Sequence, residues 1–368
     1  MERINLERQF VFISVVALSL FGLLLIYSAS CIYALRTYNN SAYFFSRQVV
    51  YLVISLVAFF LALLLDIGTI RRFNKEFLFF TVFLLVLVLV IGKKAGGARR
   101  WLSLGVVSFQ PSEILKIAFP LYVADFFVRK GGTIRLLREG LLPLLFIWGV
   151  FSVLIVLEPD LGTVVFWLIW IFFMLFIARA KARHLGAILL VGLLFSFILV
   201  KTHPYRFARL VSYLDPWQDP RGSGFQIIQS QIAFGEGGLW GTGLGSGRQK
   251  LLFLPAAHTD FVFSIIAEEF GFFGSLAVLS VYFLIVIKAL EISMRLKDNF
   301  ARYVCLGISF LFGLEVIINV GVSCGLMPTK GMALPFISYG GTNLFVHYVL
   351  LGIFFNLTRQ PRRLAKIE

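Results

Sequence analysis

Charged residues are scarce in this chain. They make up 14% of its 368 residues, whereas 59% of the residues are hydrophobic and 41 are Phe. An average soluble domain carries about 25% charged residues, so this shortage excludes the ordinary soluble class. Apolar runs of roughly 20 residues recur along the chain, and each is long enough to cross the hydrocarbon core as a helix. The runs are continuous rather than alternating, which favours helices over a β-barrel.

Cysteines and nucleotide-binding motifs are also lacking. Cys31, Cys305 and Cys324 show no metal-ligand spacing, and we interpret them as packing residues. The glycine-rich segment 235–247 matches neither a P-loop nor a dinucleotide fingerprint. The first apolar run lacks a small-residue cleavage site, so we expect an uncleaved span. The net charge of +15 is interpreted as a membrane feature, because basic residues hold cytoplasmic loops inside.

The pattern predicts an all-α polytopic membrane protein with one domain, residues 1–368. Short basic loops alternate with ten predicted transmembrane helices, which places both termini in the cytoplasm. The long loop between the seventh and eighth spans, about 202–260, would then be extracytoplasmic. Gly271–Gly274 could interrupt the eighth span, but that span is too short for two crossings. The predicted spans are 9–31, 47–66, 76–92, 111–128, 140–157, 161–178, 185–201, 261–287, 303–325 and 335–357.

Basic residues also occur on the predicted outer side, where few are expected. Long loops translocate regardless of charge, which accounts for those in the large loop. That reason does not cover the short segment before the fourth span. We therefore interpret its cations as a site for an anionic ligand. They are Lys93, Lys94, Arg99 and Arg100.

Further ionisable residues lie within or beside predicted spans, where charges are functional candidates by default. Glu113 and Lys116 share one helix face and form a structural ion pair, part of a site, or both. The deeper Glu268 and Glu315 are expected to bond neighbouring helices. The topology gathers the others at the outer interface: Arg99, Arg100, Glu113, Lys116, Glu158, Asp160 and Asp260.

The large outer loop is rich in Gly, Pro and Trp. Its stretch GFQIIQSQIAF, residues 224–234, predicts a short amphipathic helix in the membrane interface. The glycines of 235–247 fit either a backbone that passes close to something large or a flexible connector. Because loops of this length are usually functional or disordered, we expect an ordered loop that hosts function.

Two kinds of chemistry fit an outer pocket with cations, carboxylates and access to lipid. One is transfer of a sugar from a lipid-linked pyrophosphate, in which Arg or Lys neutralises the leaving group and an Asp acts as general base. The other is transport of an anionic lipid or solute. Composition and topology do not choose between them.

Five long motifs, in order and over nearly the whole chain, resemble the SEDS family of shape, elongation, division and sporulation proteins (RodA, FtsW, SpoVE). The resemblance is closest to the division branch, FtsW. The motifs are GARRWLSLGVVSFQPSEILK (97–116), EPDLGT (158–163), RFARLVSYLDPWQDPRGSGFQIIQS (206–230), GLWGTGLGSGRQKLLFLPAAHTDFVFSIIAEEFG (238–271) and NVGVSCGLMPTKGMALPFISYGGT (319–342).

The resemblance implies a peptidoglycan glycosyltransferase of the bacterial cytoplasmic (inner) membrane. It would polymerise lipid II into β-1,4 glycan outside that membrane and release undecaprenyl pyrophosphate. The implied partners are a class B penicillin-binding protein, which is the transpeptidase, and other membrane proteins of the division or elongation machinery, with no nucleic acid. No cofactor is certain, although Mg²⁺ or Mn²⁺ would suit phosphate and carboxylate ligands.

The resemblance also implies roles for single residues. Asp260 matches the aspartate of the HTDF motif, the catalytic candidate that would deprotonate the acceptor 4-hydroxyl. Arg100 would bind the pyrophosphate, and Trp101 would pack against sugar or lipid. Glu113 and Lys116 would order the pocket. The other candidate substrate-binding residues are Asp160, Lys250, His258 and Ser338, the last expected in the outer half of span 10, where close packing through Gly340 and Gly341 is an equal alternative.

Some residues depart from the family pattern. Leu252 and Ala256 stand where many relatives carry acidic residues, so this chain lacks that second acidic group of the loop and any role of that group in activation or metal binding. Thr342 keeps the hydroxyl of the usual Ser. Asn343 is unusual, and nothing in the sequence explains it.

Two other functions stay open. A lipid II flippase would suit ten spans and buried charges, but a transport path would place titratable residues near the midplane, where few occur. A non-catalytic scaffold of the division or elongation machinery would be unaffected by substitution of Asp260.

Overall fold

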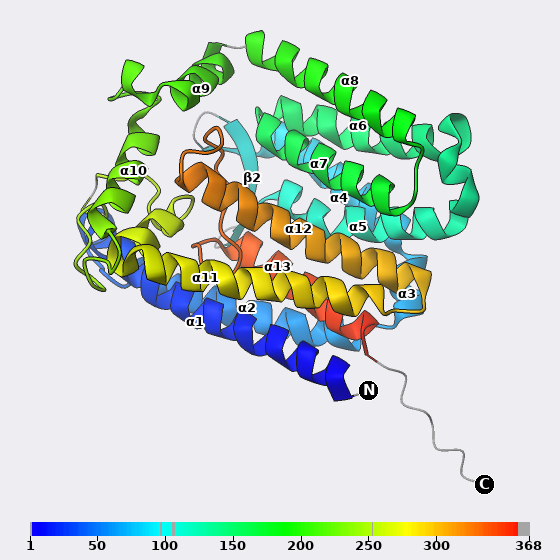
Figure 1. The fold of residues 1–368 in the computed structure, drawn as a ribbon, viewed down its shortest axis with the longest axis horizontal. Coiled ribbons are helices and arrows are strands. Elements are labelled where there is room, and N and C mark those ends of the chain that lie inside the picture. The colour runs from blue at the N-terminus through cyan, green and yellow to red at the C-terminus, as the bar shows by residue number, and fades with distance from the viewer. Residues whose placement is uncertain (1, 96–97, 105–106, 203, 252, 360–368) are drawn as a thin grey trace.

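The computed structural model describes residues 2–95, 98–104, 107–202, 204–251 and 253–359, and it is predominantly helical (Figure 1). Three short strands form the sheet of the described chain: β1 (Lys93–Ala95), β2 (Ala98–Leu104) and β3 (Val107–Phe109). The α-helices are α1 (Glu2–Tyr38), α2 (Tyr43–Leu64), α3 (Ile67–Arg72), α4 (Asn74–Ile91), α5 (Pro111–Lys130), α6 (Leu142–Leu157), α7 (Leu161–Ile177), α8 (Ala182–Lys201), α9 (Pro204–Leu214), α10 (Phe225–Gly237), α11 (Val262–Met294), α12 (Asn299–Ser323) and α13 (Gly341–Leu357).

The long helices lie side by side in a bundle (Figure 1). The strand β2 and the helices α9 and α10 gather at one end, whereas α3, the start of α1 and the end of α13 lie toward the other. The α3 end carries Arg71 and Arg72 in a short connection, which is the kind of basic loop that stays in the cytoplasm. The orientation in the membrane stays a prediction from this charge pattern.

Every predicted span falls on a helix; these helices are α1, α2, α4 to α8 and α11 to α13. Seven of the described helices are long and apolar enough to cross a membrane. The helices α7 and α13 are apolar but have 17 residues each, and α5 carries Glu113, Lys116 and Asp125. Large apolar side chains such as Ile13, Leu64 and Phe79 stay exposed. The protein is therefore a multi-pass membrane protein, and the count of ten crossings stays a prediction.

The sheet before α5 was not predicted. Strands β1, β2 and β3 pair antiparallel, with Lys93 opposite Trp101 and Leu102 opposite Phe109. Leu102 is buried against Leu84 and Val88 of α4, so the sheet rests on the end of that helix. Apolar residues at alternate positions of WLSL were the local signal for a strand, but the segment is too short to stand out beside the long apolar runs.

The large loop is mostly helical. The predicted helix GFQIIQSQIAF is confirmed as α10, which extends to Gly237, while α9 was not predicted. The helix α10 packs on the bundle through Ser230, whose hydroxyl lies 2.6 Å from the Ser264 hydroxyl and donates to the carbonyl oxygen of Ser323 (2.6 Å). The loop is thus anchored to α11 and α12 by buried polar contacts.

The helix α11 is broken at Gly271, whose backbone angles are φ 67° and ψ −164°. The break leaves carbonyl and amide groups without helical partners, and such groups need partners inside a membrane. The glycine-rich segment 238–243 supplies these hydrogen-bond partners. It passes so close to α11 that a Cβ at Gly241 would lie 2.3 Å from the Glu269 carbonyl oxygen. The four bonds run from Thr242 N to Glu268 O (2.9 Å), Gly243 N to Glu269 O (3.0 Å), Phe272 N to Gly238 O (2.9 Å) and Phe273 N to Leu239 O (3.2 Å).

We expect Gly271→Ala to destabilise the protein severely. Its backbone angles are accessible almost only to Gly, and an added Cβ would lie 2.3 Å from the amide nitrogen of Gly241. Strain and overlap together should cost about 3 kcal/mol or more. Thermal unfolding of the purified protein in detergent measures the effect, with Gly235→Ala as control, because a Cβ there meets open space in α10. Equal melting temperatures for the two variants would contradict the prediction.

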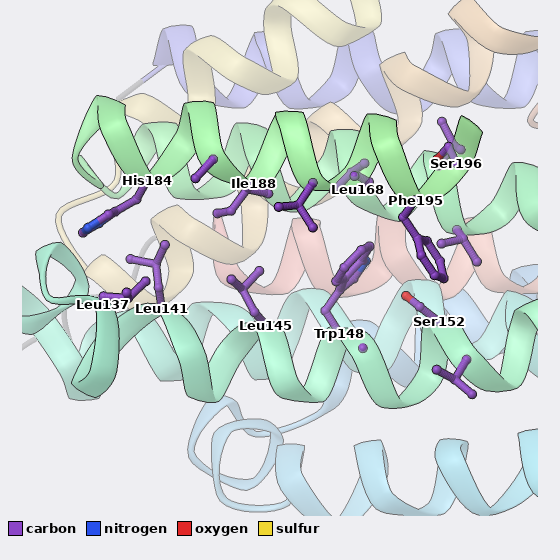
Figure 2. A pocket seen from close by; sticks show the side chains of 17 residues that line it. Leu137, Leu141, Leu145, Trp148, Ser152, Leu168, His184, Ile188, Phe195 and Ser196 are labelled. Carbon is purple, nitrogen blue, oxygen red and sulfur yellow. The ribbon is translucent and has the colours of Figure 1, made fainter. Parts of the chain in front are cut away.

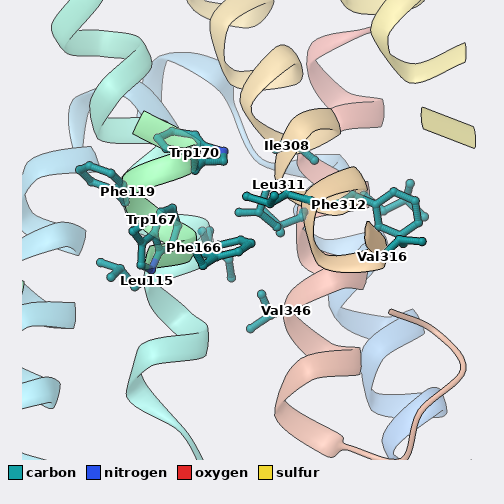
Figure 3. Close-up of a cluster of buried hydrophobic side chains, with 14 of the residues drawn as sticks. Leu115, Phe119, Phe166, Trp167, Trp170, Ile308, Leu311, Phe312, Val316 and Val346 are labelled. Atoms are coloured by element: carbon teal, nitrogen blue, oxygen red, sulfur yellow. The ribbon is translucent and has the colours of Figure 1, made fainter. Parts of the chain in front are cut away.

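The aromatic core lies between α5, α7 and α12 (Figure 3). The rings of Phe119, Trp167 and Trp170 contact one another at 5.2 to 5.4 Å between centroids. Trp170 Nε1 donates to the carbonyl oxygen of Gly307 across α7 and α12 (2.9 Å). Leu115 and Val346 join the same core. This packing holds α5, α7 and α12 together in the middle of the bundle.

Candidate active site

Asp260 sits two residues before α11, at the end of the large loop, and its backbone is held from two sides. Its amide donates to the carbonyl of Ala256 (3.1 Å), a residue with φ of 57°. Its carbonyl accepts from Asn319 Nδ2 of α12 (2.9 Å), which also donates to the carbonyl of Met332 (2.6 Å). The catalytic candidate is therefore fixed to α12 and to the loop 324–340.

The Asp260 carboxylate faces the backbone of Gly331, where a Cβ would lie 2.8 Å from Oδ2. None of the described residues makes a hydrogen bond to it, so its oxygens are available to accept a proton. Burial raises the pKa of Asp260 to about 6, although the positive charge of Arg209 opposes this rise. A carboxylate with a pKa near the operating pH suits a general base.

Glu113 and Lys116 form the expected ion pair (2.7 Å), but that pair is one part of a larger network. Lys116 Nζ also contacts Glu315 of α12 at 2.5 Å, and Glu315 contacts His347 Nε2 of α13 at 2.6 Å. Asn343 Nδ2 donates to Glu113 (3.2 Å), which gives this unusual residue a role. The network ties α5, α12 and α13 together beside the site, and Glu315 acts between helices as expected.

Glu268 does not bond to a neighbouring helix as expected. Its carboxylate accepts from the backbone amides of Arg248 and Gln249, the latter at 3.0 Å. The next residue, Glu269, accepts from Lys250 Nζ (2.6 Å) and from Ser28 (2.7 Å). These two carboxylates anchor the loop ahead of Asp260. Lys250 is buried in this anchor, so its predicted contact with substrate finds no support in the geometry.

The turn 158–160 between α6 and α7 carries the candidate residue Asp160 and is contacted by Arg100. Asp160 begins α7 as its N-cap and accepts from the Thr163 amide (3.1 Å) and hydroxyl (2.8 Å). Arg100 donates from Nε to the carbonyl of Glu158 (2.8 Å) and from Nη2 to that of Pro159 (2.7 Å). Arg100 therefore holds this turn in place, and its binding of pyrophosphate stays a prediction.

The two carboxyl groups of this turn differ in charge. Burial, with the nearby Asp160 charge, raises the pKa of Glu158 to about 8 against the pull of Arg100. Burial also opposes ionisation of Asp160, but Lys330, Arg100 and the Thr163 hydrogen bonds outweigh it and lower the pKa of Asp160. Asp160 is therefore the charged member of the pair at neutral pH.

Sequence reasoning missed Lys330, which lies between α12 and α13. Its Nζ is buried, has no hydrogen-bond partner among the described residues, and lies 5.5 Å from the ring centroid of Phe166. Burial lowers the pKa of Lys330 to about 8, while the charge of Asp160 opposes this fall. The signal was available, because Lys330 is another cation on the predicted outer side, where few are expected.

The remaining predicted residues lie around this centre. The ring of His258 lies among the aromatic rings of Tyr33, Phe44 and Tyr339, 4.6 to 5.9 Å between centroids, and burial lowers its pKa to about 4. His258 is therefore neutral at neutral pH and packs among these rings, and its contact with substrate stays a prediction. Trp101 lies half-buried on β2.

The expected position of Ser338 in the outer half of span 10 was wrong, because α13 begins at Gly341. Ser338 lies in the preceding loop, where its Oγ accepts from the Leu334 amide (2.9 Å). The alternative expectation was close packing through glycine. It is met at Gly341, where a Cβ would lie 3.0 Å from the Tyr51 ring.

Among the described residues, no three His, Cys, Asp or Glu side chains come together as ligands for a metal ion. Ala256 stands where relatives often carry a carboxylate, and its backbone carbonyl accepts hydrogen bonds from the following amides. The other such position, Leu252, lies outside the described residues. The described side chains therefore do not form a ligand set for Mg²⁺ or Mn²⁺, whose binding stays a prediction.

Comparisons with known proteins identify the family. The model of the FtsW, RodA and SpoVE family, described as "Cell cycle protein", matches residues 8–363. A "Probable peptidoglycan glycosyltransferase FtsW" of Trichlorobacter lovleyi is 41% identical over 94% of this chain and 91% of its own length. The "Stage V sporulation protein E" of Bacillus subtilis is 39% identical over 93% and 92%.

Solved structures agree with this family. A chain from a structure titled "Structural coordination of polymerization and crosslinking by a peptidoglycan synthase complex" has a TM-score of 0.75 and 31% identity, over 95% of this chain and 96% of that one. The rod shape determining protein RodA of Thermus thermophilus has a TM-score of 0.69 and 26% identity, over 95% of each chain. The chain belongs to the FtsW, RodA and SpoVE family of cell cycle proteins.

Proposed function

We propose that the protein is a peptidoglycan glycosyltransferase that polymerises lipid II at the outer face of the bacterial cytoplasmic membrane. Relatives named as this enzyme align with the chain over nearly their whole length, so the chain is an enzyme of the same class. The observation that carries the mechanism is the Asp260 carboxylate, whose backbone is fixed on both sides while its oxygens have no hydrogen bond from the described residues.

In the proposed reaction, one proton is transferred, one glycosidic bond forms and one bond to phosphate breaks at this site. The acceptor 4-hydroxyl oxygen attacks the anomeric carbon of the donor sugar, and Asp260 takes the hydroxyl proton. The bond from the anomeric carbon to the phosphate oxygen breaks, and its electron pair leaves with undecaprenyl pyrophosphate. Cations beside Asp260 stabilise that leaving charge, which is the largest electrostatic demand of the step.

A class B penicillin-binding protein is the partner that we propose for cross-linking the product. The structure of a peptidoglycan synthase complex, with a TM-score of 0.75 to this chain, supports such an assembly. An outward-facing site is supported by the basic α3 at the opposite end of the bundle (Figure 1).

An apolar cavity of about 490 Å³ between α6, α7 and α8 supports binding of the prenyl chain (Figure 2). Its lining includes Leu145, Trp148, Leu168 and Phe195, with few polar groups. Val164, also in the lining, is one helical turn along α7 from the cap residue Asp160. A chain in this cavity would therefore enter close to the charged end of the site.

We expect Gly149→Phe to fill this cavity and weaken use of long-chain lipid II. A side chain at Gly149 meets open space in the cavity, and excluding only two buried CH₂ groups would lower kcat/KM by about tenfold. Initial rates with lipid II of full chain length, compared with a short-chain analogue, measure the effect. Gly186→Phe is the control, because it is exposed on α8 outside the cavity lining. An equal loss with both substrates would contradict chain binding here.

The test of the proposed function is glycan polymerisation from purified lipid II by the reconstituted protein, with and without its transpeptidase. We expect polymer of increasing length with the partner present. A lipid II flippase is the second candidate, because the Lys116, Glu315 and His347 network places charges inside the helical bundle. Absence of polymer together with transbilayer movement of labelled lipid II would favour the flippase.

A further inference from the structure

Lys330 is in an unusual environment for a lysine. Its ammonium nitrogen is buried and has no hydrogen-bond acceptor among the described residues. Buried charges in proteins are normally paired and hydrogen-bonded, because removal from water is costly. The ring of Phe166, 5.5 Å away, and the charge of Asp160 offset only part of that cost, because neither accepts a hydrogen bond from Nζ. Such a group is expected where a bound anion completes the pairing.

The other buried or half-buried cations near the site already have acceptors. Lys116 lies against Glu113 and Glu315, Lys250 lies against Glu269, and Arg100 donates to two backbone carbonyls. Among the buried lysine and arginine nitrogens of the described chain, only Lys330 Nζ and Arg8 Nε lack one. Arg8 lies near the start of α1, at the other end of the bundle, and its Nη2 donates to the carbonyl of Phe355.

The backbone places Lys330 between the two motifs of the site. The next residue, Gly331, is the one whose Cβ would meet the Asp260 carboxylate at 2.8 Å. On the other side, a Cβ at Gly162 would lie 2.5 Å from Lys330 Cδ, so this glycine of the EPDLGT motif makes room for the lysine side chain. An anion on Nζ would therefore lie between the base and the start of α7.

We propose that Lys330 is the residue that binds the pyrophosphate of the lipid-linked donor, and that Arg100 is a positioning residue for the turn 158–160 beside it. This inference rests on the proposed glycosyltransferase function. As the bond from the anomeric carbon to the phosphate oxygen breaks, its electron pair stays on that oxygen. The Lys330 ammonium keeps its proton and balances the new charge, while Asp260 holds the proton from the acceptor hydroxyl.

The test measures binding apart from turnover. Farnesyl pyrophosphate and farnesol are titrated calorimetrically into the purified full-length protein, the alcohol reporting the chain alone. We expect Lys330→Met to weaken farnesyl pyrophosphate binding by about ten- to a hundredfold, as for loss of a charge-assisted hydrogen bond, and to leave farnesol binding unchanged. Lys330→Arg should retain most of the pyrophosphate preference. Arg129→Met, whose partly exposed side chain pairs with Asp125 away from the site, is the control.

Thermal unfolding separates a binding role from a structural one. Lys330 has no hydrogen bond to lose, although its charge helps to keep Asp160 ionised. We therefore expect Lys330→Met to lower the melting temperature less than Lys116→Met, which loses two ion-pair contacts, whereas a purely structural lysine would lower it as much. Unchanged pyrophosphate binding in Lys330→Met, or a wild type that does not distinguish farnesyl pyrophosphate from farnesol, would overturn the inference. Asp260→Asn separates a failure of the proposed function from a failure of the Lys330 inference. This variant should bind farnesyl pyrophosphate normally while making no glycan, so binding tests the anion site and glycan synthesis tests the proposed function.

Discussion

Asp260→Asn should abolish glycan polymerisation while leaving the protein folded and partner-bound. Asn keeps the size of the side chain and its backbone contacts with Ala256 and Asn319, but it cannot accept the hydroxyl proton. General-base catalysis contributes about a hundred- to ten-thousandfold to rate. Gel analysis of glycan made from purified lipid II measures the loss. Asp215→Asn is the control, because it changes a carboxylate of the same loop that only caps a short helical turn.

The pH dependence of the wild type provides a second check on the same residue. Burial raises the pKa of Asp260 to about 6, so the carboxyl group is protonated and inactive as a base below that pH. We expect kcat/KM to rise about tenfold per pH unit up to pH 6 and then to level off. An acidic limb near pH 4, or polymer from Asp260→Asn at the wild-type rate, would assign the base to another group.

Lys116→Met should cause the largest loss of stability of any charge removal in the bundle. The substitution leaves Glu113 and Glu315 without their shared cation, and Glu315 is fully buried. Breaking a buried ion pair from one side costs about 3–5 kcal/mol. Thermal unfolding and the yield of folded protein in detergent measure it.

Two variants make this prediction specific to the buried network. Arg129→Met removes a cation from the same helix, but that side chain is partly exposed and Arg71 also pairs with Asp125, so we expect a loss below about 1 kcal/mol. The double variant Lys116→Met with Glu315→Gln should recover part of the stability lost in the single variant. Equal effects of Lys116→Met and Arg129→Met would show that the network contributes little.

The sequence predicted the apolar helices well because length and hydropathy are local properties. All ten predicted intervals fall on helices, most of them within a few residues of the observed bounds. The errors concern segments whose structure depends on distant partners. Ser338 lies in a loop that bonds to α2 through Gln48, and β2 is positioned by packing on α4. Neither contact has a signature within its own segment.

The candidate site was predicted in part. Asp260 and the pair Glu113 and Lys116 could be found from their place at span ends and from family motifs. The sequence could not separate Lys330, which has no hydrogen-bond partner among the described residues, from Lys250, which is bound to Glu269 and to Ser28, 222 residues away. It also could not foresee that Asn343 reaches Glu113 across the helices α5 and α13.

The sequence by itself determined the class of protein, its apolar helices, its family and the residue types available for chemistry. These follow from hydrophobic length, charge placement and motif order, which are read along the chain. Only the tertiary structure decided which charges pair and which stay available. Pairing depends on side chains from several helices meeting inside a membrane, where each polar group needs a partner, and those partners are far apart in sequence.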